Sequence, residues 1–201
     1  RLAEVFRSVS LSRFDIAFSL RHNARTVHEL PAGSGESGRD RRVADVLGHE
    51  FIAQCLRFDE QAGDLRLWGW AGLPQVARAQ RDQQYLYVNG RRVRDRAVTH
   101  ALQRAYADVL FHGRHPAFVL NLELPHRDVD VNVHPTKHEV RFREARQVHD
   151  FVQHSLQRVL AATRAGSSAS IAVRSPASAA AAEQLPLAVR EGVARYGALH
   201  G

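Results

Sequence analysis

The sequence predicts an α+β domain, in which strands with one apolar face pack against amphipathic helices. The strand pattern is clearest where Val129, Val131 and Val133 alternate with polar residues, because successive side chains of a strand point to opposite faces. The helix pattern is clearest between Val148 and Leu160, where apolar residues recur at helical spacing. Elements that each carry one apolar face are expected to bury these faces against each other in layers.

The elements before residue 39 form a first group. A helix is expected at the start of the chain, since its first apolar residues fall at helical spacing. Alternation predicts a strand over 14–20 and a return strand over 26–30, joined by a turn at 22–24. Residues 31–38 are rich in glycine and serine, which predicts a loop or linker.

The second group of elements begins near Arg39. We expect a helix over 39–47 closed by Gly48, strands over 51–57, 64–70, 85–88, 118–124 and 129–133, a loop over 71–83, and helices over 98–109 and 148–160. Asn89-Gly90 is a strong signal for a tight turn, and Asp95 is a candidate helix cap. After residue 162 alanine and serine dominate. Few large apolar side chains remain to offset the entropy lost on ordering, so 163–201 is predicted to be a flexible linker.

The charge balance favours an acidic partner. The net charge is +7, and such an excess makes nucleic acid the first candidate. Arginine carries nearly all of the positive charge, because Lys137 is the only lysine. The single cysteine, Cys55, is interpreted as a small buried hydrophobe, and a reducing compartment is expected. No apolar run is long enough to span a bilayer. Since the chain starts with Arg1 and has no methionine, we expect a piece of a longer protein.

The most informative segment is DVDVNVHPTKHEVRF at 128–142. It is a strand that runs into a turn, and Pro135 keeps His134 extended. Such a rigid turn presents Lys137 at a defined place, and a lysine ammonium group suits a terminal phosphate. From the residues alone, a solvated surface lysine is the commoner interpretation.

Two metal-site interpretations of this segment fail on spacing. His134, His138 and Glu139 do not form the HExxH pattern, and the proline breaks a shared helical face. The acidic run over 128–132 resembles the start of a calcium loop, but the required glycine and terminal glutamate do not follow. No metal site is therefore predicted.

A second candidate site consists of arginines. Arg91, Arg92, Arg94 and Arg96 surround the Asn89-Gly90 turn and the start of the following helix. Guanidinium groups contact phosphate oxygens without reading bases, and a helix N-terminus near Arg96 adds backbone donors. The alternative interpretation is an ordinary solvated charge run.

These motifs together resemble the MutL family of DNA mismatch repair proteins. The segment 128–142 is very similar to the signature near the end of the MutL N-terminal region. YLYVNGR at 85–91 looks like the family's strand-turn motif, and Arg94-Asp95-Arg96 follows as in bacterial members. Phe14-Asp15 fits the end of the ATPase subdomain that precedes them. The resemblance covers roughly residues 1–162.

The resemblance implies a piece of a GHKL-type ATPase region. Residues 1–35 are expected to be the C-terminal end of the GHKL ATPase subdomain. Residues 36–162 are expected to be a ribosomal protein S5 domain 2-like transducer subdomain with a mixed sheet and packed helices, and 163–201 the linker. The family implies that Lys137 contacts the γ-phosphate of ATP. The general base and the Mg²⁺-binding residue belong to parts that this sequence lacks. ATP and Mg²⁺ are thus expected only in the full-length protein, and no ATPase activity is expected from this chain alone.

The resemblance also implies partners. Arg96 matches the family's DNA-binding arginine, and Arg91, Arg92 and Arg94 are expected either to assist it or to have structural roles. Expected partners are DNA of any sequence, MutS and other mismatch repair proteins, and a second copy of the full-length protein, in the bacterial cytoplasm and away from membranes. Two alternatives stay open, namely the transducer domain of a type II topoisomerase B subunit and a stand-alone nucleic-acid-binding module.

Overall fold

The computed structural model describes residues 2–130 and 140–164, with side chains described as far as residue 162. The elements in chain order are α1 (Leu2–Ser10), β1 (Phe18–His22), β2 (Arg25–Leu30), α2 (Gly35–Leu47), α3 (His49–Ala53), β3 (Cys55–Ala62), β4 (Leu65–Gly72), the 3-10 turn η1 (Pro74–Val76), β5 (Gln84–Val88), β6 (Arg91–Arg92), α4 (Arg96–Tyr106), β7 (Phe118–Glu123), the 3-10 turn η2 (His126–Asp128), β8 (Val129–Asp130), β9 (Arg141–Phe142) and α5 (Ala145–Arg164).

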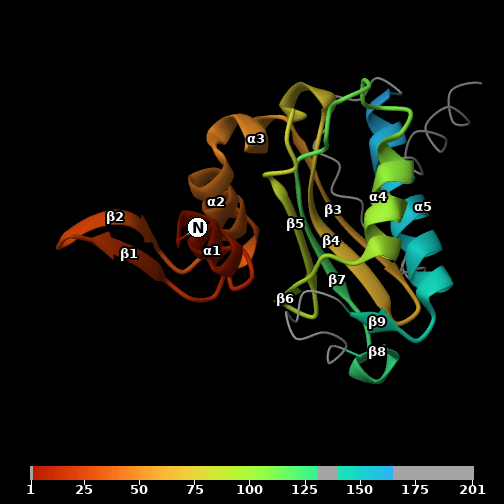
Figure 1. Cartoon of the computed structure of the whole chain (residues 1–201), viewed down its shortest axis with the longest axis horizontal. Coiled ribbons are helices and arrows are strands. Elements are labelled where there is room, and N and C mark those ends of the chain that lie inside the picture. Colours follow the sequence, from red (N-terminus) through yellow and green to blue (C-terminus); the bar gives the residue numbers. More distant parts are fainter. Residues whose placement is uncertain (1, 131–139, 165–201) are drawn as a thin grey trace, which may run out of the picture.

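A five-stranded mixed sheet forms the centre of the molecule (Figure 1). Its strand order is β3-β4-β7-β5-β6. The pairs β3–β4, β4–β7 and β5–β6 are antiparallel, whereas β5 and β7 are parallel. A parallel pair needs a crossover connection, and the segment through α4 supplies it. The mixed sheet with packed helices agrees with the predicted α+β class.

Helices cover both faces of this sheet (Figure 1). On one face α4 and α5 bury Leu120 and Leu122 of β7 in a core that also contains Leu102 and Leu156. On the other face the N-terminal segment and α2 cover Trp70, Tyr85 and Val119, with Leu11 and Phe14 in the same core. The alternation of β7 side chains between the two cores is what places Asn121 and Glu123 on the face of the N-terminal segment.

Several elements confirm the predictions from local pattern. The α4 helix begins beside Asp95, and its apolar stripe Val98, Leu102 and Ala105 is buried, but it ends at Tyr106 and not at the predicted residue 109. The α5 helix is longer than the predicted 148–160, but its apolar face is the expected one. The turn at Asn23 and Ala24 joins β1 and β2, with positive φ at both residues, and this hairpin extends away from the sheet (Figure 1).

Two predicted strands were wrong at their starts. Phe14 precedes β1, and its ring packs 5.6 Å from that of Trp70 in the core. Phe51 belongs to α3 and is 2% exposed, so β3 begins only at Cys55. Short apolar runs fit a buried helical turn as well as a strand, and packing against the sheet decided between them.

The predicted loop over 31–38 was also partly wrong, because α2 begins at Gly35. Glycines disfavour a helix, but tertiary contacts of other α2 side chains hold this one. Asp40 of α2 accepts a hydrogen bond from Nε1 of Trp70 at 2.7 Å, and Arg57 of β3 pairs with Glu36. The predicted stop at Gly48 is confirmed, with φ of 101° there. Among the described helices, none has the length and apolar character needed to cross a bilayer.

Candidate functional site

The arginines predicted to form a site lie on one tight structure, here called the arginine turn and defined as residues 89–96. Strand β5 ends at Val88, and positive φ values at Asn89 and Gly90 reverse the chain into β6. A two-residue turn with both φ values positive matches the twist of an antiparallel pair, which explains the Asn-Gly sequence. Arg91 and Arg92 then pair with Val88 and Tyr87.

Asn89 anchors the arginine turn to the end of β7. Its Nδ2 donates to the carbonyl oxygen of Leu124 at 2.9 Å, and its Oδ1 accepts from the backbone N–H of Leu124 at 3.1 Å. Its own N–H donates to the carbonyl of Leu122 at 3.0 Å. The two hydrogen bonds of its side-chain amide and the one of its backbone N–H set the position of the turn as well as its shape.

The four arginines are not equivalent. Arg91, Arg94 and Arg96 are exposed, and no ion pair with them is found within the described residues. The Arg92 side chain is only 15% exposed; its Nη2 donates to the carbonyl of Gln84 at 3.0 Å, and its guanidinium lies 4.3 Å from the ring centre of Tyr85. Arg92 therefore holds the turn against the sheet, while the other three present their charge to solvent.

Asp95 fixes the start of α4 and with it the direction of Arg96. Its carboxylate accepts the N–H of Val98 at 2.9 Å, as expected of a residue that caps a helix. We expect Asp95→Ala to lower the free energy of unfolding by about 1 kcal/mol. Urea unfolding measures this change, and Asp95→Asn is the control that keeps a capping oxygen. A loss as large in the asparagine variant as in the alanine variant would contradict the capping role.

Lys137 lies outside the described residues, as do His134, Pro135, His138 and Glu139, but the ends of its segment are described. Val129 of β8 pairs with Phe142 of β9, and the N–H of Arg143 donates to the carbonyl of Asp128 at 2.8 Å. Val129, Val140 and Phe142 belong to the core under α4 and α5. The segment that carries Lys137 therefore leaves from and returns to one anchored place.

That anchored place adjoins the arginine turn. The Nδ2 atom of Asn89 lies 3.4 Å from Nδ1 of His126, which begins η2 just before β8. Figure 1 shows β6, β8 and β9 at the same end of the sheet. Two motifs that are more than thirty residues apart in the sequence are thus brought together by the hydrogen bonds of Asn89 with the end of β7.

Arg42 is a structural centre that sequence reasoning missed. It is 1% exposed, and its guanidinium donates to the carbonyls of Ser10 at 2.9 Å, Ile16 at 2.7 Å, and Pro31, with Arg13 at 3.4 Å. Burial lowers the pKa of Arg42 from its ordinary value, and neighbouring Asp45 opposes this effect. One side chain of α2 thereby holds the loops on both sides of the β1–β2 hairpin. No local signal distinguishes it from the adjacent Arg39 and Arg41.

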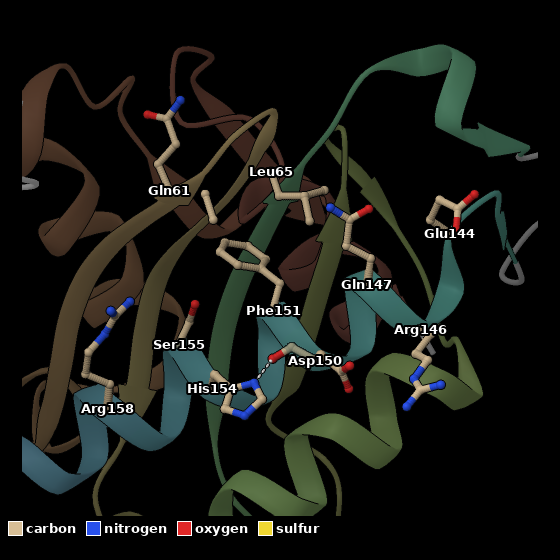
Figure 2. Close-up of a pocket in the computed structure, with 11 residues that line it drawn as sticks. Gln61, Leu65, Glu144, Arg146, Gln147, Asp150, Phe151, His154, Ser155 and Arg158 are labelled. Carbon is tan, nitrogen blue, oxygen red and sulfur yellow. Dashed lines mark hydrogen bonds between the residues drawn. The ribbon is translucent and has the colours of Figure 1, made fainter.

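A hollow lies between α5 and the β3–β4 turn (Figure 2). It has a volume of about 810 Å³, and Leu65 and Phe151 provide apolar lining. Its other walls mix carboxylates and guanidinium groups, with Asp150 beside Arg146 and His154 bonded to the Asp150 carbonyl at 2.7 Å. Because both signs of charge are present, this groove is a poorer site for a polyanion than the arginine turn.

Cysteine and metal chemistry contribute little to the described part of the chain. The Cys55 thiol is half-buried, and this burial, reinforced by Asp40, raises its pKa to about 12, so it stays protonated at neutral pH. Within residues 2–130 and 140–164 no group of three histidine, cysteine or carboxylate side chains is arranged to hold a metal ion.

Comparison with known proteins identifies relatives along most of the chain. Residues 43–161 match the family described as DNA mismatch repair protein, C-terminal domain. The DNA mismatch repair protein MutL of Chromohalobacter salexigens is 59% identical over 161 residues, covering 80% of this chain and 25% of that protein. The MutL of Azotobacter vinelandii is 52% identical over 196 residues, covering 92% of this chain and 31% of that protein.

The chain covers only part of the length of these relatives. The chain spans about a quarter to a third of the length of these curated relatives. Among solved structures, the N-terminal domain of a DNA repair protein superposes with a TM-score of 0.64 at 21% identity, covering 81% of this chain and 53% of that one. At this identity the superposition shows a shared fold.

Proposed function

Because this chain belongs to the MutL family of DNA mismatch repair proteins, we propose that it holds DNA on the arginine turn and supplies Lys137 to ATP. The observation that carries the proposal is the anchoring of Asn89. It joins the turn bearing Arg91, Arg94 and Arg96 to the end of β7 and to His126, shortly before β8, from which the Lys137 segment departs. A displacement of the arginine turn or of the Lys137 segment can therefore be transmitted to the other through the hydrogen bonds of Asn89.

The DNA part of the proposal rests on exposed charge. Arg91, Arg94 and Arg96 present guanidinium groups to solvent beside the N-terminus of α4. Such groups bind phosphate oxygens and give affinity without sequence preference, and the net charge of +7 assists the approach of a polyanion. Arg92 acts by holding the turn, since its guanidinium is occupied by Gln84 and Tyr85.

The ATP part rests on the family resemblance of the segment 128–142. Lys137 would place an ammonium charge against the γ-phosphate of ATP and stabilise negative charge there as the phosphoryl group is transferred. The full-length protein would supply the nucleotide-binding region with its general base and its Mg²⁺. The five-stranded sheet with α4 and α5 would then act as the ribosomal protein S5 domain 2-like transducer, preceded over residues 1–35 by the edge of the GHKL ATPase subdomain.

The remaining parts of the proposal concern assembly. The full-length protein would couple ATP binding and hydrolysis to DNA binding and to recruitment of MutS and other repair proteins. It would do so as a homodimer in the bacterial cytoplasm. The names of the relatives support a role in mismatch repair.

The DNA proposal is tested by reversing one charge. We expect Arg96→Glu to weaken the binding of duplex DNA about tenfold and to lower the slope of log affinity against log salt by about 1, because fewer counterions are released. Fluorescence anisotropy of a labelled duplex at several salt concentrations measures both quantities.

Arg81 offers a matched control for this charge reversal. It is an exposed arginine that precedes β5, at the opposite end of that strand from the arginine turn. Arg81→Glu makes the same change in net charge, so its effect reports the general electrostatic contribution. Equal losses of affinity in the two variants would remove Arg96 from the DNA site.

A further inference from the structure

A hollow of about 580 Å³ lies on the face of the sheet that the N-terminal segment covers. Trp68 and Asn121 form its base, and Phe14, Arg39 and the first residues of α2 form its walls. Gly90 of the arginine turn also lines it, so the hollow opens beside the surface proposed to hold DNA. Its volume is within the range of pockets that bind small organic ligands.

Asn121 is the first sign that this hollow takes a ligand. The residue is 6% exposed and lies on β7 between Trp68 of β4 and Tyr87 of β5. Its neighbours Leu120 and Leu122 point into the opposite core, so the Asn121 side chain points toward the hollow. Its Nδ2 is buried and has no hydrogen-bond partner among the described residues. A buried amide donor without an acceptor is costly, and an acceptor atom in the hollow would remove that cost.

Two further sets of hydrogen-bond donors line the hollow. The Arg39 guanidinium lies 4.8 Å from the ring centre of Trp68. The α2 helix begins at Gly35, and its N-cap residue Ser34 makes no side-chain hydrogen bond to the helix. The N–H groups of the first turn therefore remain available, and a helix N-terminus with a nearby arginine suits a phosphate.

The two carboxylates of the hollow are each paired with an arginine, although Arg66 divides its charge between Glu123 and Asp59. Asp15 is bound by Arg13 through two hydrogen bonds of 2.9 and 2.8 Å. Glu123 lies 3.1 Å from Arg66, and its other oxygen accepts the indole N–H of Trp68 at 2.7 Å. The charge of Asp15 is thus offset by Arg13, and that of Glu123 is offset in part, so the two oppose a bound anion less than unpaired carboxylates would.

The aromatic lining indicates the second half of the ligand. The rings of Phe14 and Trp68 lie 6.3 Å apart and form an apolar wall next to the donors. Aromatic side chains stack on nucleobases with little sequence preference, and every base carries an acceptor that an amide N–H can reach. A planar base with an attached phosphate matches this combination of groups.

We propose that this hollow binds one unpaired nucleotide of a DNA single strand. The phosphate lies at the N-terminus of α2 beside Arg39, the base packs against Trp68, and Asn121 Nδ2 donates to an acceptor of the base. The inference rests on the proposed binding of DNA by the arginine turn, from which Gly90 leads directly into the hollow. It adds a single-strand site to a surface whose arginines bind duplex phosphates.

The tryptophans of the chain make the test direct. The chain contains two, and Trp70 is 2% exposed with its indole N–H bonded to Asp40, so Trp68 is the residue that a ligand in the hollow reaches. We expect a short oligo(dT) to quench the tryptophan fluorescence of the 201-residue chain. Asn121→Leu and Arg39→Gln are each expected to weaken this binding about tenfold.

Two further variants keep the test decisive. Asn121→Asp preserves the size of the side chain but replaces the donor by a carboxylate, so it is expected to weaken binding at least as much as Asn121→Leu. Thermal unfolding of each variant shows whether it is folded. If the Asn121 variants do not fold, Arg39→Gln still tests the hollow, because Arg39 is partly exposed. Arg81→Gln is the matched control for the loss of one charge and is expected to bind oligo(dT) normally.

Several results would overturn the proposal. These are an unchanged fluorescence with oligo(dT), unchanged affinity in the folded Asn121 and Arg39 variants, or binding of thymidine monophosphate as tight as that of oligo(dT), which would indicate a site for free nucleotides.

Duplex binding separates the two proposals. If Arg96→Glu weakens duplex binding while oligo(dT) leaves Trp68 unaffected, the arginine turn stands and the hollow does not. The reverse pattern overturns the arginine turn alone.

Discussion

Replacing Lys137 by alanine is expected to lower the ATP turnover of the full-length protein by about 100-fold while the fold is unchanged. Removal of one preorganised group that stabilises developing charge typically has an effect of this order. Lys137 is the only lysine of the 201-residue sequence, so no neighbouring lysine within it can take over the contact. Steady-state phosphate release measures the turnover, and a nucleotide-binding assay separates weaker binding from slower hydrolysis.

The Lys137 variant needs a control for structure. Val129, Val140 and Phe142 anchor the two ends of the segment in the core, so a substitution between them should leave the unfolding transition in place. Lys137→Arg keeps the positive charge but replaces a compact ammonium group by a planar fork, and it is expected to restore turnover only in part. Wild-type turnover in Lys137→Ala would exclude the proposed contact with ATP.

Replacing Arg42 by methionine is expected to destabilise the chain by about 3 kcal/mol. The methionine fills much of the same volume, but it leaves the carbonyls of Ser10, Ile16 and Pro31 buried without their donor. Ser10 ends α1, so the substitution also removes a positive charge from the C-terminus of that helix. Urea unfolding followed by circular dichroism measures the change in the free energy of unfolding.

The neighbouring residue provides a control for Arg42. Arg41 is exposed on the same helix, and Arg41→Met removes an equal charge with the same change in side-chain type. It is expected to change the stability by less than about 0.5 kcal/mol, as is usual for exposed sites. If both variants lose similar stability, the carbonyl contacts of Arg42 are not the cause.

The family assignment shows where sequence reasoning is strongest. The segment 128–142 and the YLYVNGR motif indicated the MutL family, and the match over residues 43–161 confirmed it. The turn at Asn89, the cap at Asp95 and the helix after it were also predicted correctly. The roles of Lys137 and Arg96 remain predictions, and Lys137 lies outside the described residues.

The errors share one physical origin. Phe14 and Phe51 were placed in strands because a few apolar residues suit either a strand or a buried turn, and only the sheet beneath them resolves the ambiguity. For Arg92 both an assisting and a structural role were predicted, and the contact of its guanidinium with Tyr85 could not be read from the sequence. Arg39, Arg41 and Arg42 are equally polar in the sequence, yet only Arg42 is fully buried.

The sequence by itself determined the local elements, the family and the residues that carry charge, because helix periodicity, turn residues and motifs act over a few neighbouring positions. Only the tertiary structure decided the strand order with its parallel β5–β7 pair, the meeting of the arginine turn with the base of the Lys137 segment, and the hollow above Asn121. These features depend on contacts between residues far apart in the chain. Their free energy arises from packing and hydrogen bonding in three dimensions, for which a single sequence has no local signal.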